Sequence, residues 1–313
     1  MGATGKQGGG LIRAMLNHPE RGLVPRGITR DLNSDAARKL VNLGVNMIKA
    51  DLDDPKSIHK AFEGAYGAYC VTSFWEHMSP SREIAHARNM AKAARDTDIK
   101  HVIWSTLEDT RRWIPLDDNR MPTLMDKYKV PHFDAKGEAD SIFRDLNLPV
   151  TNLLTSFYWE NFIDFNIRPE IHSNGQLMFS LPIGNKKLTA IASEDIGKCA
   201  FGIFSKDTLY IGQTIGIVGE KLTGEQMADH FSELLGQPVH YNNIPIAEYR
   251  QSGGPVIEDM ANMFQFMQDF EHEFGSARNQ RLSRELNPEL QTFKQWLSDH
   301  KKHFKHQEPE ALV

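Results

Sequence analysis

Three glycines near the amino terminus have the spacing of a phosphate-binding loop. They are Gly2, Gly5 and Gly8 in the string GATGKQG, and a helical pattern follows at once. Glycines at these positions let the backbone approach a pyrophosphate, and the amino end of the helix offers N–H groups to the anion. Three glycines alone are a weak signal. The helix after them and a strand-like segment about twenty residues later favour a dinucleotide site.

The end of that strand-like segment, GLVPRGITR, bears on which dinucleotide would bind. An NAD site usually has Asp or Glu there to accept the ribose hydroxyls, whereas this chain has Thr29-Arg30. The Arg30 guanidinium suits a 2′-phosphate because it forms bidentate, charge-assisted hydrogen bonds. A solvated surface arginine is the alternative, and Asp31 directly after it weakens the argument. The pattern favours NADP(H) over NAD(H).

Polar residues also end the next two strand-like segments. Asp51, in KADLDD, can accept a hydrogen bond from the adenine amino group. Asp53 can cap the next helix, whose Pro55 stands in the first turn. Residues 72–74, Thr-Ser-Phe, would lie over the middle of the cofactor, since ligands bind at the carboxyl ends of parallel strands.

The elements that must position these residues alternate between strands and helices. Continuous apolar strands separated by helical patterns predict a parallel sheet covered on both faces. We therefore predict an α/β fold with a Rossmann-type doubly wound parallel sheet over residues 1–153. A smaller α+β part over residues 154–313, packed on it, would serve a substrate or partner. The strand-like runs after the first are VNMIKADL, AYGAYCVTS, KHVIWST and PVTNLLTS.

Composition narrows the class of protein. The 313 residues include 36 basic and 41 acidic side chains. The resulting net charge of −5 does not indicate direct nucleic-acid binding. Only Cys70 and Cys199 are present, so we expect no disulfide framework. No apolar run approaches the ~20 residues that cross a bilayer, and the start lacks a signal-peptide profile. We expect a cytoplasmic protein, with the nucleus as a further compartment, and no membrane partner.

Several strings together resemble the NmrA-like family of atypical short-chain dehydrogenases, in particular its animal NADPH-sensor branch. HFDAKGE is the most specific of them and the glycine loop the least. The likeness continues through MANMF and QWLSDHKKHF, so it covers essentially the whole chain. The strings are GATGKQGG, ITRD, ADLDD, AYCVTSFWE, HFDAKGE and FYWENF.

The resemblance implies that a dinucleotide contacts the glycine loop, the strand ends and a segment near residue 160. Relatives can carry a lysine in the helix after the fourth strand, where this chain has Ala85, so one phosphate or ribose contact is in question. The loop after Arg30, DLNSDAARK, is also less basic near its start than the family would suggest. The implied residues are Gly2, Ala3, Thr4, Gly5, Lys6, Gln7, Gly8, Arg30, Asp51, Leu52, Thr72, Ser73, Phe74, Lys136, Tyr158, Trp159, Glu160 and Asn161.

The proton-donating pair of catalytic dehydrogenases is absent. In Tyr-x-x-x-Lys the lysine lowers the phenol pKa, so that tyrosine can protonate a carbonyl. None of the seven tyrosines has a lysine four residues later, and the corresponding string is His132-Phe-Asp-Ala-Lys136. His132 is a substitute general acid, a hydrogen-bonding residue at the helix start, or a remnant, and we favour the second. Ser105, at a strand end, and Tyr158 are further weak catalytic candidates.

Two other patterns have a simpler structural explanation. His300, His303 and His306 recur every three residues, but lysines separate them and no acidic or cysteine partner is near, so we expect no metal site. Three methionines follow helical spacing among phenylalanines. They are more typical of a core than of a partner groove, although methionines can line such grooves. The methionines are Met260, Met263 and Met267.

The first strand of the predicted sheet has no counterpart in the sequence. In the doubly wound order it is central, yet only Met1 precedes the glycine loop. Each backbone group left buried and unpaired would cost about 1–3 kcal/mol. We expect the natural start to lie upstream, before about five to eight strand residues. A short isoform with a damaged cofactor site is the alternative.

Three functions remain open. The first is an NADP(H)-binding redox-state sensor that regulates a protein partner and lacks the Tyr-x-x-x-Lys pair. The second is an NADPH-dependent oxidoreductase acting on a small quinone, enone or carbonyl, because hydride transfer is the chemistry of the cofactor. The third is a nucleotide-binding scaffold without switching. The sequence favours the first, because the cofactor site looks complete while the proton donor is missing.

Overall fold

The computed structural model describes residues 1–173 and 175–304. The chain forms two compact units, each described by itself below. The first unit contains Met1–Ser156, Ser193–Ile217 and Arg278–Glu289. The second contains Phe157–Ala192, Val218–Ala277 and the residues from Leu290 onward. The sequence suggested a single boundary after residue 153, whereas the chain returns twice to the first unit after leaving it at Ser156.

The first unit is built on parallel strands. β3 (Gly67–Cys70), β4 (His101–Thr106), β5 (Val150–Leu154) and β10 (Thr214–Gly216) form a sheet in the order β10-β5-β4-β3. β1 (Arg26–Thr29) pairs in parallel with β2 (Asn46–Lys49) in a separate two-stranded sheet. Every pair of neighbouring strands in these two sheets is parallel. The predicted Rossmann-type α/β class is therefore confirmed.

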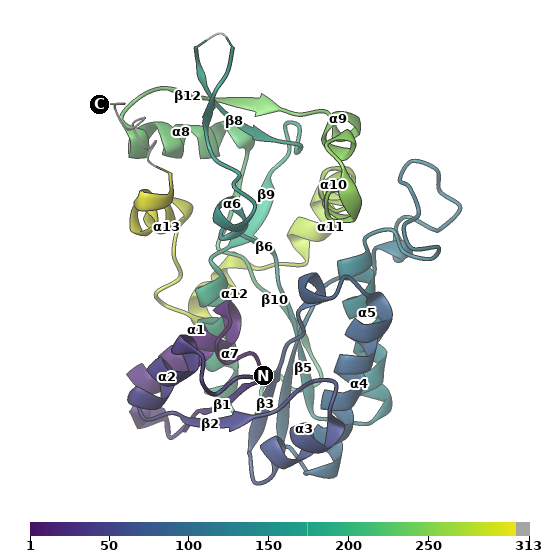
Figure 1. Cartoon of the computed structure of the whole chain (residues 1–313), viewed down its shortest axis with the longest axis vertical. Helices are drawn as coiled ribbons and strands as arrows, with labels where there is room; N and C mark the ends of the chain where they lie inside the picture. Colours follow the sequence, from purple (N-terminus) through teal and green to yellow (C-terminus); the bar gives the residue numbers. More distant parts are fainter. Residues whose placement is uncertain (174, 305–313) are drawn as a thin grey trace. The chain divides into compact units, whose positions relative to one another are not determined.

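Helices cover both faces of these strands (Figure 1). Side chains of the third, fourth and fifth helices pack with alternate residues of β3 and β4 in one core cluster, which includes Phe62, Met90, Trp104 and Phe143. A smaller cluster joins Ile12 of the first helix to Leu40 of the second. The helices of the first unit are α1 (Lys6–Asn17), α2 (Asp35–Asn42), α3 (Pro55–Phe62), α4 (Pro80–Asp96), α5 (Pro131–Asp145), α7 (Ser193–Phe204) and α12 (Gln280–Leu286), with the 3-10 turns η1 (Pro19–Arg21), η2 (Phe74–Glu76) and η3 (Thr110–Arg112).

Local sequence signals account for the helix starts. The Ser34 hydroxyl accepts a hydrogen bond from Ala37 N at the start of α2, and the Ser79 hydroxyl does the same for Arg82 N at the start of α4. Pro55 stands in the first turn of α3, as predicted. Capping of that helix by Asp53 was wrong, because Asp54 accepts from Lys56 N instead.

Helix α7 belongs to the first unit because glycines let it approach α1 closely. A Cβ on Gly10 would meet Glu194 O at 2.4 Å, and one on Gly197 would meet Leu11 N at 2.2 Å. Any side chain at either position would push the helices apart. This contact explains why residues 193–217 fold with the amino-terminal half of the chain.

The two sheets of the first unit are separated between β1 and β3. Among the described residues no strand lies between them, and the amino terminus lies in this gap (Figure 1). The Met1 amino group donates to Tyr69 O at 2.7 Å, and Ala3 N donates to Ile28 O at 3.2 Å. Residues 1–3 therefore join the two sheets only near the carboxyl ends of β1 and β3.

The second unit has two small mixed sheets and an aromatic core. β9 lies between β11 and β6, and β8 between β12 and β7. Met260, Met263 and Met267 are buried, as expected of core residues. The elements are β6 (Phe157–Tyr158), α6 (Asn161–Asp164), β7 (Glu170–Ile171), β8 (Leu177–Leu181), β9 (Leu188–Ile191), β11 (Glu220–Leu222), α8 (Gly224–Leu235), β12 (Val239–Asn243), α9 (Ile246–Gln251), α10 (Gly254–Asp269), α11 (Glu271–Ser276), α13 (Phe293–Asp299) and η4 (Lys301–His303).

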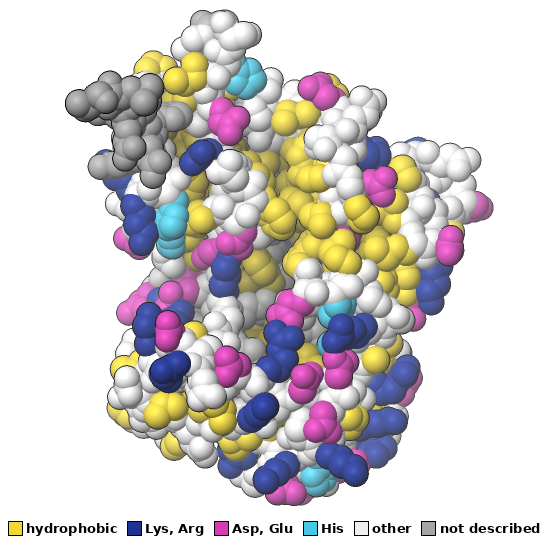
Figure 2. Space-filling view, viewed as in Figure 1, with side chains coloured by type: hydrophobic (Ala, Val, Ile, Leu, Met, Phe, Trp, Pro, Cys, Tyr) yellow, Lys and Arg dark blue, Asp and Glu magenta, His cyan; other side chains and the backbone are white. Residues whose placement is uncertain are grey.

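The surface offers no extended field of one charge on the face shown in Figure 2. Basic and acidic side chains are intermingled over the strands and helices of the first unit. Within the described residues, no helix combines the length and the apolar character that spanning a membrane requires.

Candidate functional site

Each glycine of the amino-terminal loop has a structural reason. Gly2 has a φ of +61°, in the left-handed region that favours glycine. A Cβ on Gly8 would meet Gly2 O at 2.3 Å, so the helix could not lie against the loop with a larger residue there. Gly5 is the N-cap of α1 and, having no side chain, leaves the first turn of the helix without a side-chain cap. The loop thus presents bare backbone at a helix amino end, which is the geometry of an anion site.

Gln7 is fixed inside this loop by two hydroxyl groups. Its Oε1 accepts a hydrogen bond from the Ser105 hydroxyl at 2.9 Å and another from the Tyr69 hydroxyl. All three residues are buried. The structure therefore gives Ser105, proposed from the sequence as a weak catalytic candidate, an anchoring contact that ties α1 to the ends of β3 and β4.

Arg30 follows β1 and is open to solvent. Its side chain is 62% exposed, and its guanidinium lies 2.7 Å from Glu76 in η2, the turn after β3. An accessible guanidinium at this strand end fits the predicted contact with a 2′-phosphate. A phosphate arriving there would compete with Glu76 for the same cation.

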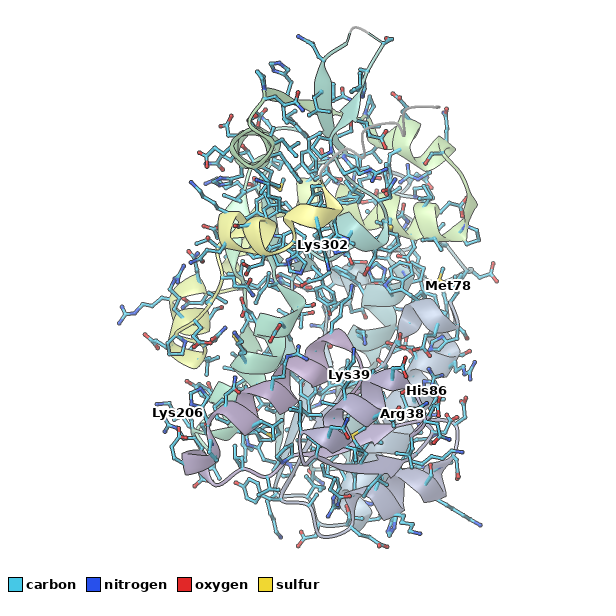
Figure 3. The ribbon with its side chains drawn as sticks, turned by 60° about the vertical axis from the view of Figure 1, so that its left-hand side comes forward. Arg38, Lys39, Met78, His86, Lys206 and Lys302 are labelled. Atoms are coloured by element: carbon cyan, nitrogen blue, oxygen red, sulfur yellow. The ribbon has the colours of Figure 1, made fainter. Side chains whose placement is uncertain are left out.

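The loop after Arg30 is held by a second arginine. Arg38 Nε on α2 donates to Asn33 O at 2.8 Å, and the Asp31 carboxylate accepts from Asn33 N at 2.8 Å. Figure 3 shows Arg38 and Lys39 together on α2. These two cations lie beyond the loop start, so sequence reasoning, which looked for charge near that start, passed over them.

The end of β2 carries the acidic turn expected for an adenine site. Asp51 is half-buried, and its carboxylate accepts from Asp53 N at 3.0 Å. Asp53 pairs with Arg82 and with His86 Nε2, the latter at 2.8 Å; both come from α4, on which Figure 3 marks His86. The hydrogen bond from Arg82, followed by that from His86, lowers the pKa of Asp53 to about 2. Leu52 O accepts from Asn89 on the same helix, so α4 fixes this turn.

Lys136 is the centre of a buried polar cluster. Its ammonium lies 2.8 Å from Glu83 Oε1, donates to Thr72 Oγ1 and lies 5.2 Å from the centre of the Trp104 ring. His77 Nε2 lies 3.3 Å from the other oxygen of Glu83, which has no exposed surface. Burial opposes ionisation of Glu83, but the nearby Lys136 charge and the polar contacts outweigh it and lower its pKa to about 2.

Sequence reasoning found Lys136 and Thr72 but missed Glu83 and His77. Glu83 stands in the first turn of α4, where an acidic residue is commonplace because it complements the helix dipole. Its partner is 53 positions further along the chain, on α5. No local pattern in the sequence distinguishes such a residue from an ordinary solvated one.

His132 stands where a catalytic tyrosine would be, one turn before Lys136 on α5. Its ring is buried and packs on Trp75 and Phe133, each with a centroid distance of 4.7 Å. The ring of Phe74, which the resemblance placed at the cofactor, has its centroid 6.0 Å from that of His132. Ser73 is exposed beside it. The imidazole is thus part of an aromatic cluster at the end of β3.

The residues near position 160 belong to the second unit. The Trp159 ring is buried, with centroids 5.5 Å from Phe293 and 6.1 Å from Trp296. Glu160 accepts from Trp296 Nε1 at 3.2 Å, and Asn161 begins α6. The Trp159 indole therefore serves the core of its own unit. Tyr158, on β6, is half-buried.

The carboxyl-terminal histidines are placed only in part. His300 stacks on Trp296 at 4.7 Å, His303 is exposed, and His306 lies outside the described residues. Across residues 1–173 and 175–304, no group of three or more His, Cys, Asp or Glu side chains is arranged to hold a metal ion.

The parallel strands, the helix-capping glycine loop and the residues at the strand ends define a Rossmann-type protein. A model of the NmrA-like family matches residues 1–297, and the chain belongs to this NAD(P)-binding family. The NmrA-like oxidoreductase FrzB of Cladobotryum sp is 26% identical to it over 292 residues, which cover 86% of this chain and 82% of FrzB.

Two solved proteins share the fold. The negative transcriptional regulator NmrA in complex with NAD has a TM-score of 0.77 at 22% identity, and its NADP complex has 0.75 at 23%; each match covers 95% of this chain and 92% of NmrA. The Citrobacter sp. triphenylmethane reductase complexed with NADP(H) has 0.74 at 19% identity and covers 96% of this chain and 98% of the reductase. Proteins that share this fold thus include one named as a regulator and one named as a reductase.

Proposed function

We propose that this chain binds NADP(H) and acts as a redox-state sensor, whose cofactor occupancy sets its affinity for a protein partner. One observation supports this most directly. The glycine loop leaves bare backbone at the start of α1, and an imidazole packed among aromatic rings stands where the proton-donating phenol would be, one turn before Lys136.

The residues of the first unit fit a dinucleotide. The cradle between Gly2 and Gly8, which a Cβ would fill, and the uncapped start of α1 suit the diphosphate. Arg30 would hold the 2′-phosphate, and Lys136 with Thr72 would hold the ribose beside the nicotinamide. Bound NADPH supplies a hydride to an acceptor. The chain's own residues bind and orient the nucleotide around that chemistry.

Proton delivery is the step that these residues serve poorly. The Lys136 charge is compensated by Glu83 at 2.8 Å, and the Ser105 hydroxyl is engaged by Gln7 at 2.9 Å. General acid catalysis needs a donor within hydrogen-bond reach of the reacting atom. A site in which Lys136 and Ser105 are already engaged suits occupancy-dependent signalling better than carbonyl reduction.

The pair of Arg30 and Glu76 gives the sensor an element that changes with occupancy. The pair links the loop after β1 to the turn after β3. A 2′-phosphate that takes over Arg30 would release Glu76 and alter the charge at this edge. A partner that prefers one of the two arrangements would be coupled to the nucleotide, because differential binding to two states is the source of such coupling.

A second candidate is an NADPH-dependent oxidoreductase for a small quinone, enone or carbonyl. The names of relatives favour it, since FrzB is called an oxidoreductase and the Citrobacter protein a triphenylmethane reductase. A quinone accepts a hydride and takes its proton from water, so the absence of a tyrosine would not prevent that reaction.

Calorimetry and turnover measurements together test the proposal. We expect heat of binding with NADPH and NADP⁺, at least tenfold weaker binding of NADH, and turnover below ~1 s⁻¹ over a panel of quinones, enones and aldehydes. Saturable turnover above that value would establish the second candidate. Absence of binding heat with every nicotinamide nucleotide, in protein shown to be folded by circular dichroism, would reject both.

A further inference from the structure

His77 and Glu83 face each other in the buried cluster around Lys136. Their side chains are 5% and 0% exposed, and His77 Nε2 lies 3.3 Å from Glu83 Oε2. Neither atom has a hydrogen-bond partner of good geometry among the described residues. Buried polar atoms are nearly always satisfied in native structures. An unsatisfied pair in contact therefore indicates an interaction that a change of state would complete.

The protonation state of the His77 ring follows from its second nitrogen. Nδ1 accepts a hydrogen bond from Ser79 N at 3.1 Å, and a backbone N–H can only donate. Nδ1 therefore carries no proton, and the ring is neutral with its hydrogen on Nε2. In this arrangement the imidazole offers Glu83 only a neutral donor, while the charged Lys136 ammonium lies 2.8 Å from the other carboxylate oxygen.

Glu83 thus has two competing counter-ions from two different elements. Lys136 comes from α5 and His77 follows η2, and each faces one oxygen of the same carboxylate. Glu83 stays ionised throughout the range in which an imidazole titrates, because its pKa is about 2 and that of an ordinary imidazole is about 6.5. If Lys136 were drawn away, this buried charge would be uncompensated, and a proton on His77 would restore the balance.

We propose that His77 is a proton-linked positioning residue of the cofactor site, which takes up a proton and balances Glu83 when Lys136 turns to a bound nucleotide. The proton comes from solvent and adds to Nδ1, so the site gains one positive charge as the anionic nucleotide enters. Linkage then requires nucleotide affinity to rise as pH falls through the range in which His77 titrates. The nucleotide as the trigger rests on the proposed function, whereas the exchange of counter-ions rests on the geometry of the three side chains.

Protonation would also move the turn that carries His77. A hydrogen on Nδ1 would meet the N–H of Ser79 at 3.1 Å, and because two donors repel, the turn would have to open. Met78, in the middle of the turn and labelled in Figure 3, has a φ of +52°, which is costly for a residue other than glycine. Glu76, next to His77, pairs with Arg30. A proton at His77 and a phosphate at Arg30 would therefore act on the same turn.

The other charged groups near His77 are engaged elsewhere or lie beyond Glu83. The His86 ring has its centroid 5.3 Å from that of His77, but its Nε2 is bonded to Asp53 at 2.8 Å, and Asp53 also pairs with Arg82. Glu83 Oε2 is the acceptor that faces His77 Nε2. The titratable and charged groups of the neighbouring elements are Asp53 after β2, Glu76 in η2, Arg82, Glu83 and His86 on α4, and His132 and Lys136 on α5.

Two-bond 1H–15N NMR spectra of the histidine rings between pH 5 and 9 test the exchange without any nucleotide. In the wild type we expect a neutral His77 ring at pH 7 with its hydrogen on Nε2; the His77→Gln variant identifies its signal. Lys136→Gln keeps a hydrogen-bond donor but removes the charge. It should raise the titration midpoint of His77 by at least about one pH unit, a tenfold gain in proton affinity. Lys136→Gln/Glu83→Gln should bring the midpoint back to the wild-type value.

Lys100→Gln is the matched control, because it removes the cation of an exposed pair with Asp98. It should leave the His77 midpoint unchanged. A midpoint that Lys136→Gln does not raise would overturn the proposal. A His77 ring already protonated at pH 7 in the wild type would overturn it as well, and this measurement needs no variant, so it stays decisive if Lys136→Gln does not fold.

A second measurement asks whether a nucleotide triggers the exchange. Calorimetric titrations at pH 7 in two buffers of different ionisation enthalpy give the number of protons taken up with each nucleotide. We expect the wild type to take up about half a proton more than His77→Gln. The difference should be the same for NADPH and NADH, although only NADPH carries a phosphate with a pKa of about 6. Equal uptake by the two proteins would overturn the link to the cofactor. Absence of binding heat would reject the proposed function, and the NMR result alone would then decide the exchange.

Discussion

Glu83 of α4 and Lys136 of α5, which are 53 positions apart in the sequence, form a buried ion pair with 2.8 Å between Glu83 Oε1 and Lys136 Nζ. Glu83 has no exposed surface and the Lys136 side chain is 12% exposed. The pair holds Lys136 in place on α5 and neutralises its positive charge. It therefore bears on stability, on cofactor binding and on the lack of a proton donor.

Replacing Glu83 with Gln should cost about 3 kcal/mol of unfolding free energy, because it leaves Lys136 partly buried without its counter-ion. Urea denaturation at pH 7 measures the loss. Glu63→Gln is the matched control, since the Glu63 carboxylate is exposed and lies 3.5 Å from His59 at the surface; its effect should stay within about 0.5 kcal/mol. Equal effects of the two substitutions would contradict a buried role for Glu83.

The same carboxyl should give a characteristic acid profile. Its pKa is about 2 in the folded chain against an ordinary 4.5, so between these values the unfolded state binds more protons. The stabilisation is complete above pH 4.5 and is lost as pH falls toward 2, on the order of 3 kcal/mol in all. Denaturation midpoints measured from pH 2 to 6 should show this slope in the wild type and a flatter one in Glu83→Gln.

Arg30→Asp should weaken NADPH binding about 10- to 100-fold, as expected for loss of a charged hydrogen-bonded contact. NADH affinity should stay within about threefold, because its ribose carries no 2′-phosphate. Glu76→Gln provides the opposite test: it removes the 2.7 Å competitor for the guanidinium and should strengthen NADPH binding alone. Calorimetric titrations of the wild type and both variants with each of the two nucleotides, six combinations in all, decide the matter. An unchanged NADPH/NADH ratio in Arg30→Asp would exclude Arg30 from recognition.

Features that depend on neighbouring residues could be predicted from the sequence. The spacing of Gly2 and Gly8 reflects a contact between two residues only six positions apart, and Ser34 itself marks the start of α2. The parallel class followed in the same way from apolar strands alternating with helices. Such features can be predicted because the physical cause and its sequence signal lie in the same short segment.

Features that depend on distant residues could not be predicted. The return of α7 to the first unit rests on Gly10 and Gly197, which are 187 positions apart and each look like ordinary helix glycines. The charge balance at Lys136 rests on Glu83, which resembles a dipole-complementing residue. Asp54 rather than Asp53 caps α3, while Asp53 pairs with Arg82, a residue 29 positions further along the chain.

Ser105→Ala should weaken NADPH and NADH equally, by about three- to tenfold, because it removes one of the hydrogen bonds that hold Gln7 and so loosens the first turn of α1. Tyr69→Phe should have a similar effect, since its hydroxyl donates to the same oxygen. Titration of both nucleotides measures it. If Ser105 served catalysis instead, Ser105→Ala would lower turnover and leave both affinities unchanged.

His132→Tyr recreates the Tyr-x-x-x-Lys spacing on α5 and tests the central assumption about the site. The phenol would lie one turn from Lys136, but Glu83 already compensates that charge, so the tyrosine pKa should fall only slightly. We expect carbonyl reduction to become measurable and to fall as pH rises and the phenol loses the proton that it must donate, while remaining below ~1 s⁻¹. His132→Phe is the control for packing against Trp75 and should show no turnover. Faster carbonyl reduction by the wild type than by His132→Tyr, lost in His132→Phe, would instead identify His132 as a general acid and the protein as a reductase.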